Sequence, residues 1–188
     1  MRRLAPLFGA VLVLAVPAFA GQLAGVTLPD ETEAGGKTLV LNGLGLREAT
    51  LLMMDVYVAG LYLESKTSDA SAILAPDRAK RLVLKFVRSV GREKLVEAWD
   101  EGLDKNGGEK REAVAGGFAR LNAAMADVKK GDTLVLTFLP GEGTSVEVKG
   151  KPVATIEGDD FQSVLFSIWL GANPPNVGLR DGLLGLDR

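Results

Sequence analysis

The chain has 188 residues, a length typical of a single domain. It is 47% hydrophobic and 24% charged, which is the composition of a globular protein and not of a disordered or fibrous one. It contains no cysteine and no histidine. These absences exclude disulfides, thiolate nucleophiles, iron–sulfur clusters, histidine metal sites and a Ser–His–Asp triad. Any chemistry must therefore use Arg, Lys, Asp, Glu, Ser, Thr or the two tyrosines, Tyr57 and Tyr62.

Residues 1–20 have the features of a secretory signal peptide. Arg2 and Arg3 form a positively charged start, residues 7–19 are apolar, and Ala18-Phe19-Ala20 is typical of a cleavage site. The alternatives are an uncleaved anchor and a buried core helix, but the apolar run is shorter than the roughly 20 residues that a bilayer span needs. We expect cleavage near Ala20, no membrane span in the mature chain, and a periplasmic or secreted location.

The charge of the mature chain excludes some classes of partner. Without Arg2 and Arg3 the basic residues fall from 22 to 20 against 24 acidic residues, which gives a net charge of −4. This acidity argues against nucleic acid or an anionic membrane surface as the main partner. Gly43-Leu44-Gly45 lacks the third glycine and the following helix of a dinucleotide site, and Asp159-Asp160 is typical of a helix start. We therefore expect no cofactor and no bound metal.

The mature chain begins with a turn-rich stretch at residues 21–36, an N-terminal extension that holds one short strand at residues 26–28. The domain itself is expected over residues 37–188. Its first predicted strand covers residues 38–47 and is interrupted by two glycines. Glycine inside a strand marks a bulge or a close approach of another backbone.

The next two predicted strands supply most of the candidate functional residues. Residues 50–64 are apolar at both alternate positions, so both faces of this strand should be covered. Alternation places Tyr57 and Tyr62 on opposite faces. A strand over residues 80–90 would place Arg88 in line with Leu82, Leu84 and Phe86.

The remaining elements alternate between helices and strands. A short helix over residues 68–74 is capped by Ser68 or Asp69. Further helices are predicted over residues 92–105, 109–128, 160–170 (capped by Asp159) and 179–186, and strands over residues 133–139, 144–148 and 153–156. Trp99 and Trp169 fall on apolar helix stripes and are expected in the core. This order predicts an α+β fold, a mainly antiparallel sheet backed by a layer of helices on one face.

Several segments together resemble the chalcone isomerase-like family, in the family's order. They are LNGLGLR at 41–47, VYVAGLYL at 56–63, RLVLKFVRSV at 81–90 and FQSVLFSIWLG at 161–171, followed by Pro174-Pro175 and Leu183-Leu184-Gly185. The resemblance covers about Thr38 to Gly185 and is closest to the exported bacterial branch, of the non-catalytic type. It implies an open-faced β-sandwich, in which a large antiparallel sheet is backed by helices.

The resemblance also implies a choice between catalysis and binding. The family contains isomerases that close a chalcone into a flavanone, and non-catalytic members, some of which bind fatty acids in the cleft between sheet and helices. The isomerase arginine matches Arg47, the following threonine falls at Tyr57, and the late Ser/Thr falls near Gln162 or Ser163. Residues 95–106, where the enzymes carry a tyrosine and an asparagine, contain no tyrosine and end on Asn106.

Arg47 is the first candidate for ligand binding. It follows the alternating Leu44 and Leu46, so we expect it beside an apolar strand face. An unpaired guanidinium in such a wall costs several kcal/mol, so a carboxylate such as Glu48 or Asp55, solvent or an anionic ligand must satisfy it. Arg suits a ligand carboxylate because its fork donates two parallel hydrogen bonds.

Tyr57 and Arg88 complete the predicted site. Tyr57 would add a hydroxyl donor to the same ligand oxygens. Arg88 would either enter the same cleft or mark the point where its strand leaves the core. An Arg–carboxylate contact is worth about 1.5–3 kcal/mol, whereas burying about ten methylenes is worth roughly 8 kcal/mol before ordering costs. Affinity would therefore come from an apolar tail, and the arginine would select the head group.

Three hypotheses follow for the function. The first is a non-catalytic protein that binds a small apolar carboxylate, such as a fatty acid, through Arg47, Tyr57 and Arg88. The second is an isomerase or intramolecular lyase of the chalcone isomerase type, in which an arginine stabilises a phenolate or enolate. The third is an envelope protein that acts through a partner surface and binds no ligand. No sequence pattern specifies an oligomeric state.

Overall fold

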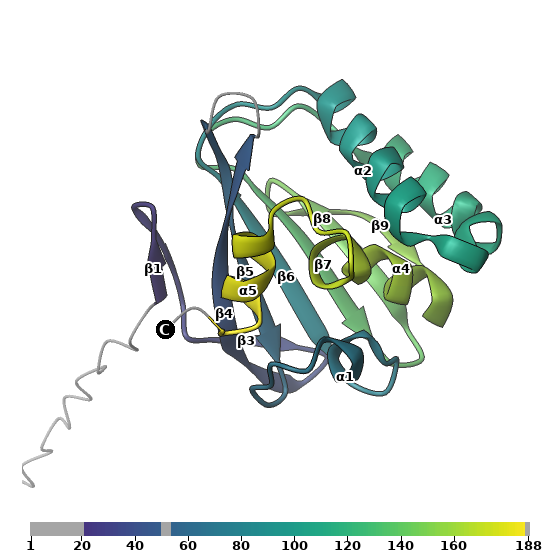
Figure 1. The fold of residues 1–188 in the computed structure, drawn as a ribbon, viewed down its shortest axis with the longest axis horizontal. Helices are drawn as coiled ribbons and strands as arrows, with labels where there is room; N and C mark the ends of the chain where they lie inside the picture. Colours follow the sequence, from purple (N-terminus) through teal and green to yellow (C-terminus); the bar gives the residue numbers. More distant parts are fainter. Residues whose placement is uncertain (1–20, 50–53, 187–188) are drawn as a thin grey trace, which may run out of the picture.

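Most of the described strands form one long antiparallel sheet. A computed structural model describes residues 21–49 and 54–186 (Figure 1). Seven strands pair in chain order from β3 to β9, each antiparallel to its neighbour, and a separate hairpin β1–β2 precedes them. The strands are β1 (Gly21–Leu23), β2 (Val26–Leu28), β3 (Glu31–Ala34), β4 (Lys37–Ala49), β5 (Met54–Leu63), β6 (Lys80–Phe86), β7 (Thr133–Leu139), β8 (Gly143–Val148) and β9 (Lys151–Ile156).

The helices form a layer on one face of this sheet, which confirms the predicted α+β architecture (Figure 1). They are α1 (Ala70–Leu74), α2 (Arg92–Asn106), α3 (Arg111–Ala124), α4 (Asp159–Leu170) and α5 (Val177–Leu183), with a 3-10 turn η1 (Gly108–Lys110) before α3. None of the helices in residues 21–49 and 54–186 is long and apolar enough to cross a bilayer.

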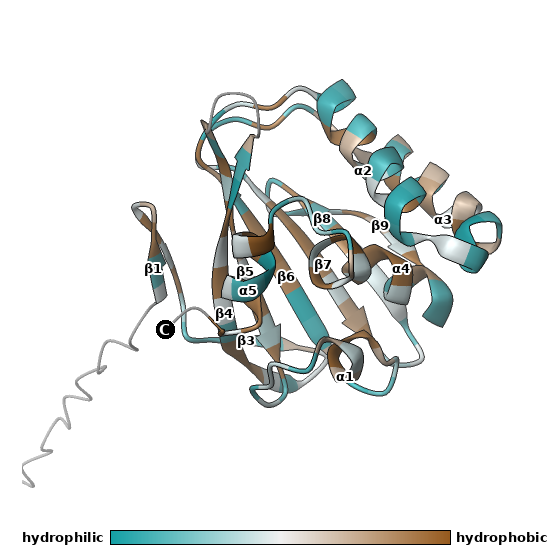
Figure 2. Ribbon diagram, viewed as in Figure 1, coloured by the Kyte–Doolittle hydropathy of each residue, from teal (hydrophilic) through white to brown (hydrophobic). Residues whose placement is uncertain are grey.

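The main core lies between the sheet and the helices. Strand alternation turns Ala59 and Leu61 of β5 and Leu82 and Leu84 of β6 toward the helices, and all four side chains are buried. In Figure 2 hydrophobic colour runs along α4 and the strands behind it, while hydrophilic colour is prominent on α2. Trp99 and Trp169 are buried in this layer, as predicted, with their rings edge to face and 5.6 Å apart.

A smaller core covers part of the opposite face of the sheet. It contains Tyr62, whose hydroxyl donates a hydrogen bond to the Pro29 carbonyl at 2.8 Å. Burial raises the pKa of Tyr62 to about 12. Tyr57 contacts the helix-side core instead, so the prediction that the two tyrosines face opposite ways is confirmed.

The glycines of β4 allow α5 to lie directly on the strand backbone. A Cβ at Gly43 would overlap the Gly182 carbonyl oxygen, and one at Gly45 would overlap the Leu179 carbonyl oxygen. The pairing of β4 with β5 also shifts register between Leu41 and Gly43. The two structural roles predicted for strand glycines, a bulge and a close backbone approach, therefore both occur in β4.

Several element boundaries differ from the predictions. Residues 21–36 contain β1 and β3 as well as the predicted strand, and β3 is an edge of the main sheet. The strand predicted over 80–90 ends at Phe86 because the chain bends at Val87 and Arg88, although the Val87 N–H still donates to the Val56 carbonyl. The helix predicted over 109–128 is shorter: it ends at Ala124, and Met125 and Val128 are buried beyond it.

The two predicted helix caps had different outcomes. Asp69 does cap α1, where its carboxylate accepts from the backbone N–H groups of Ser71 and Ala72. The cap of α4 is Gly158, with a φ of 109°, and Asp159 lies in the first turn. Gly158 can adopt this left-handed backbone without strain because it has no Cβ. The part of the predicted strand at residues 50–53 lies outside the described residues.

Candidate ligand-binding site

The sheet brings Arg47 and Tyr57 together as a directly opposed pair of β4 and β5. Both lie on the helix-facing side, since the Tyr57 ring packs edge to face on Phe86 with the ring centroids 5.7 Å apart. The expectation that Arg47 shares a face with Leu44 and Leu46 is wrong. Successive side chains of a strand alternate, so those leucines lie on the other face.

The guanidinium of Arg47 is bound by neutral oxygens. Its Nη1 donates to the Asn176 Oδ1 at 2.9 Å and to the backbone carbonyl of Glu48. The same Asn176 oxygen accepts from the Glu48 backbone N–H at 3.2 Å. Neither predicted carboxylate, Glu48 or Asp55, forms an ion pair with Arg47 in the described part of the chain. Arg47 is thus a partly buried cation whose positive charge is not neutralised by an acidic side chain.

The hydroxyl oxygen of Tyr57 already accepts a hydrogen bond, but its hydrogen is not donated to any described residue. Its oxygen accepts a hydrogen bond from the Trp169 Nε1 at 3.0 Å. Burial raises the pKa of Tyr57, and the contacts with Trp169 and Arg47 lower it by less, so the phenol is neutral. No described residue accepts the hydroxyl hydrogen of Tyr57, which leaves it free to donate.

Tyr57 belongs to a connected aromatic cluster, in which its ring contacts Phe86, its hydroxyl contacts Trp169, and Trp169 in turn packs on Trp99. Trp99 is buried, and its Nε1 has no hydrogen-bond partner among the described residues. An unsatisfied buried donor costs about 1–3 kcal/mol. The apolar helix stripes predict both tryptophans in the core, but they give no sign of where an indole N–H points, so the hydrogen bond of Trp169 to Tyr57 was not predicted.

Arg88, the third predicted site residue, is not joined to this pair. It lies beyond the end of β6, and its Nη1 donates to the Met54 sulfur at 3.1 Å. Met54 is 37% exposed at the start of β5. Arg88 forms no hydrogen bond with Arg47 or Tyr57 within the described residues, and the early end of β6 is the reason it leaves the line of Leu82, Leu84 and Phe86.

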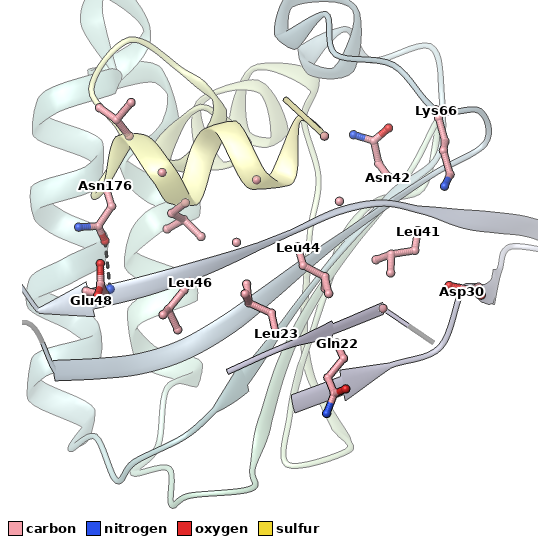
Figure 3. A pocket seen from close by; sticks show the side chains of 18 residues that line it. Gln22, Leu23, Asp30, Leu41, Asn42, Leu44, Leu46, Glu48, Lys66 and Asn176 are labelled. Atoms are coloured by element: carbon pink, nitrogen blue, oxygen red, sulfur yellow. Dashed lines mark hydrogen bonds between the residues drawn. The ribbon is translucent and has the colours of Figure 1, made fainter. Parts of the chain in front are cut away.

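A cavity of about 920 Å³ lies on the other side of β4, between this strand, α5 and the β1–β2 hairpin (Figure 3). Its apolar lining residues are Leu23, Leu41, Leu44, Leu46, Val177 and Leu179. Arg47, Tyr57 and Arg88 do not line it, but Glu48 and Asn176, the two residues that bind Arg47, do. The cavity and the Arg47–Tyr57 pair are therefore neighbours separated by the Asn176 side chain.

A buried lysine lies elsewhere in the helix-side core and was not predicted. Lys80 is 1% exposed, and its Nζ donates to the Ala75 carbonyl at 2.7 Å and to the Gln162 Oε1 at 2.8 Å. The amide of Gln162 in turn donates to the Leu74 carbonyl at 2.8 Å. Desolvation lowers the pKa of Lys80 to about 8. Gln162, which falls near the late Ser/Thr of the isomerases, thus holds a lysine in place.

A cavity of about 20 Å³, the size of one water molecule, adjoins Lys80. Asn106, the residue at the end of the stretch where the isomerases carry a tyrosine and an asparagine, donates to the carbonyls of Gly102 and Asn173 and so ties α2 to the loop before α5. Within residues 21–49 and 54–186 no group of three or more acidic side chains is placed to hold a metal ion.

Comparison with known proteins identifies the family. The family model described as chalcone isomerase-like matches residues 20–185, and the chain belongs to this family. A fatty-acid binding protein of Arabidopsis thaliana shares the fold, with a TM-score of 0.69, 20% sequence identity, and coverage of 88% of this chain and 96% of that one. No curated protein matches the sequence.

Proposed function

We propose that this member of the chalcone isomerase-like family is an exported, non-catalytic protein that binds a small apolar carboxylate, such as a fatty acid. The head group contacts Arg47 and Tyr57. One observation carries the proposal: β4 and β5 pair a guanidinium with a hydroxyl, and within residues 21–49 and 54–186 the guanidinium has no carboxylate partner and the hydroxyl has no acceptor. A carboxylate is the group that satisfies both donors at once.

The head group competes with the Asn176 amide for Arg47. A charge-assisted hydrogen bond is roughly twice as strong as one to a neutral oxygen, so a ligand carboxylate displaces the Asn176 Oδ1. The tail packs in the helix–sheet layer, beginning at Tyr57, which is one of the partly buried residues beside the main core. Because side chains fill that layer, entry of the ligand requires the helices to move away from the sheet.

The family and the fold are consistent with binding. The Arabidopsis protein described as fatty-acid binding has the same fold. The isomerases have a threonine at the position of Tyr57 and a tyrosine in the stretch that becomes α2, where this chain has none. A site that keeps the arginine, has a tyrosine in place of the threonine and has no tyrosine in α2 supports binding better than cyclisation.

Export rests on the sequence features of residues 1–20, which lie outside the described residues. We propose a periplasmic or secreted location after cleavage near Ala20. The test is Edman sequencing of the protein from the periplasmic and medium fractions of the source cells. Export predicts a chain that begins at Gly21, and a chain that keeps Met1 and stays in the cytoplasm contradicts it.

The head-group contact is tested by comparing a fatty acid with its alcohol. Palmitate and hexadecanol are titrated against the full chain, Arg47→Gln, and the exposed control Arg78→Gln. The wild type and the control should prefer palmitate, and Arg47→Gln should lose about 10-fold to 100-fold of that preference, the equivalent of about 1.5–3 kcal/mol.

Two results contradict the proposed binding. The first is an unchanged palmitate preference in Arg47→Gln, and the second is the absence of palmitate binding to the wild type. The same preparations are incubated with a chalcone. Turnover faster than in buffer would show that the protein is an isomerase and refute its non-catalytic assignment.

A further inference from the structure

One edge of the main sheet is paired over only part of its length. β3 pairs with residues 37–40 of β4, and from Leu41 to Ala49 β4 pairs with β5 alone. Strand edges offer free N–H and C=O groups to any extended chain, and proteins usually cover or charge them. Residues 41–46 of β4 contain no charged residue and no proline.

The hydrogen-bond pattern shows which backbone groups face the open edge. Residues of an antiparallel strand bond alternately to the strand on either side. The Val56 carbonyl accepts from Val87, so the even residues of β5 bond toward β6 and the odd residues bond toward β4. The β4 partners of those odd residues are Gly43, Gly45 and Arg47. The backbone groups of Leu44 and Leu46 therefore point away from β5.

The backbone groups at the two ends of this edge have hydrogen-bond partners, and most of those in the middle have none among the described residues. The Leu41 N–H donates to the Asp30 carbonyl at 2.7 Å, and the Glu48 N–H donates to the Asn176 side chain at 3.2 Å. Gly182 of α5 lies against the Leu44 carbonyl. The Leu44 N–H and both polar groups of Leu46 have no partner among the described residues.

The free edge lies along the cavity of about 920 Å³ (Figure 3). The β1–β2 hairpin forms one wall with Leu23, and α5 forms the other with Val177 and Leu179. From Asn42 to Glu48 the edge is roughly 20 Å long at about 3.4 Å per residue, which matches an extended peptide of about five or six residues. The side chains of such a strand would alternate between the two apolar walls.

The charged residues of the lining stand at opposite ends of the edge. Glu48 lies beside Asn176 at one end, and Lys66 lies near Asn42 at the other (Figure 3). Neither Glu48 nor Lys66 forms an ion pair within residues 21–49 and 54–186. Asp30, the third charged residue, is at the Lys66 end and weakens the positive potential there.

We propose that this groove binds a short extended peptide with free termini, added antiparallel to the edge of β4. The peptide ammonium group contacts Glu48 and its carboxylate contacts Lys66, which is the antiparallel direction because β4 runs from Asn42 to Glu48. Its backbone pairs with the Leu44 N–H and with both polar groups of Leu46, the mode by which strand addition gives affinity in other proteins, while Gly182 covers the Leu44 carbonyl. The site is distinct from the Arg47–Tyr57 pair and does not depend on the proposed carboxylate ligand.

The test combines peptide titration with amide hydrogen exchange of the full chain. The probe is the hexapeptide Ser-Leu-Thr-Leu-Thr-Ser with free termini, alongside its N-acetylated and its C-amidated forms. We expect the Leu44 and Leu46 amides to exchange quickly in the free protein and at least 10-fold more slowly with saturating peptide. Acetylation should weaken binding more than amidation, because Asp30 offsets Lys66.

Two variants locate the contact. Leu46→Pro removes an N–H that points to the open edge, where a strand tolerates proline, and should weaken peptide binding at least 10-fold. Leu46→Val keeps the N–H and is the matched control. Glu48→Gln should remove the effect of N-acetylation even if Leu46→Pro does not fold.

Four results would overturn the proposal. The first is no binding of the peptide, and the second is equal binding of the peptide to Leu46→Pro and Leu46→Val. The third is slow exchange of the Leu44 and Leu46 amides in a free monomer, because this would mean that another part of the chain covers the edge. The fourth is a dimer in sedimentation analysis that Leu46→Pro dissociates, which would assign the edge to a second copy of the chain.

Discussion

The substitution Lys80→Met is expected to abolish a pH dependence of stability that the buried ammonium group creates. Lys80 is packed against the rings of Phe138 and Phe166, with its Nζ 4.8 Å and 5.7 Å from their centroids, and donates to Ala75 and Gln162. Desolvation lowers its pKa from 10.5 to about 8, and the nearby carboxylates of Asp77 and Asp159 only partly oppose this.

The direction of the pH effect follows from which state holds the proton. Between pH 8 and pH 10.5 the unfolded chain binds a proton at Lys80 that the folded protein has released. Stability rises with pH wherever the unfolded state binds more protons, by up to about 1.4 kcal/mol per pH unit for one group. The free energy of unfolding should therefore increase by about 2 kcal/mol from pH 8 to pH 10.

The tyrosines set the upper limit of the pH range in which the effect of Lys80 can be measured. The pKa of Tyr62 is raised to about 12 and that of Tyr57 is raised as well. A folded group with a raised pKa contributes stability that is lost as pH rises above its unfolded value, about 10 for tyrosine. The rise caused by Lys80 is thus measured up to pH 10, where the tyrosines begin to oppose it.

Urea unfolding followed by tryptophan fluorescence is a suitable assay, because both Trp99 and Trp169 are buried in the folded protein. The wild type and the exposed control Lys130→Met should gain stability from pH 8 to pH 10, and Lys80→Met should not. A wild-type free energy of unfolding that is flat or falls over this range would refute the reasoning. An equal rise in Lys80→Met would do the same.

Three further predictions test other contacts. Gly43→Ala should lower the free energy of unfolding, measured by thermal unfolding, by about 2 kcal/mol or more, because the added Cβ overlaps the backbone of α5. Gly178→Ala is the control: its added Cβ meets open space, so its free energy of unfolding should lie within about 1 kcal/mol of the wild-type value. Tyr57→Phe removes the acceptor of the Trp169 N–H and should cost about 1–3 kcal/mol, a loss that disappears in a Trp169→Phe background. Gln162→Leu removes a hydrogen-bond acceptor of the charged Lys80. In urea unfolding it should lower the free energy of unfolding by about 2–3 kcal/mol at pH 7 and by less at pH 9.5. An equal loss at both pH values would contradict the assigned contact.

The sequence predicted those features that repeat locally along the chain. The apolar positions of β5 occur on both parities, and the structure buries both of its faces with Tyr57 and Tyr62 on opposite sides. The stripe of α2 correctly placed Trp99 in the core. These predictions succeed because backbone periodicity alone determines which side chains share a face.

The candidate site was predicted only in part. Arg47 and Tyr57 were singled out and do meet, since neighbouring antiparallel strands oppose each other. Arg88 does not join them, because β6 ends at Phe86. The alternation of Arg88 with Leu82, Leu84 and Phe86 did not show where the strand stops. β6 stops where the chain bends at Val87 and Arg88, and an alternating pattern of apolar residues does not mark such a bend.

The local pattern of residues was enough to predict the antiparallel sheet, the helices that cover it, and the glycines that admit a close neighbour, because each follows from steric rules acting over a few residues. The contacts of Arg47 with Asn176, 129 positions later, and of Lys80 with Gln162 could be seen only once the chain was folded. Folding also formed the cavity from β4, α5 and the hairpin, three segments with no local relation. The periodicity of apolar residues predicts that a face of a strand or helix is buried. Which residues contact that face depends on contacts between distant parts of the chain.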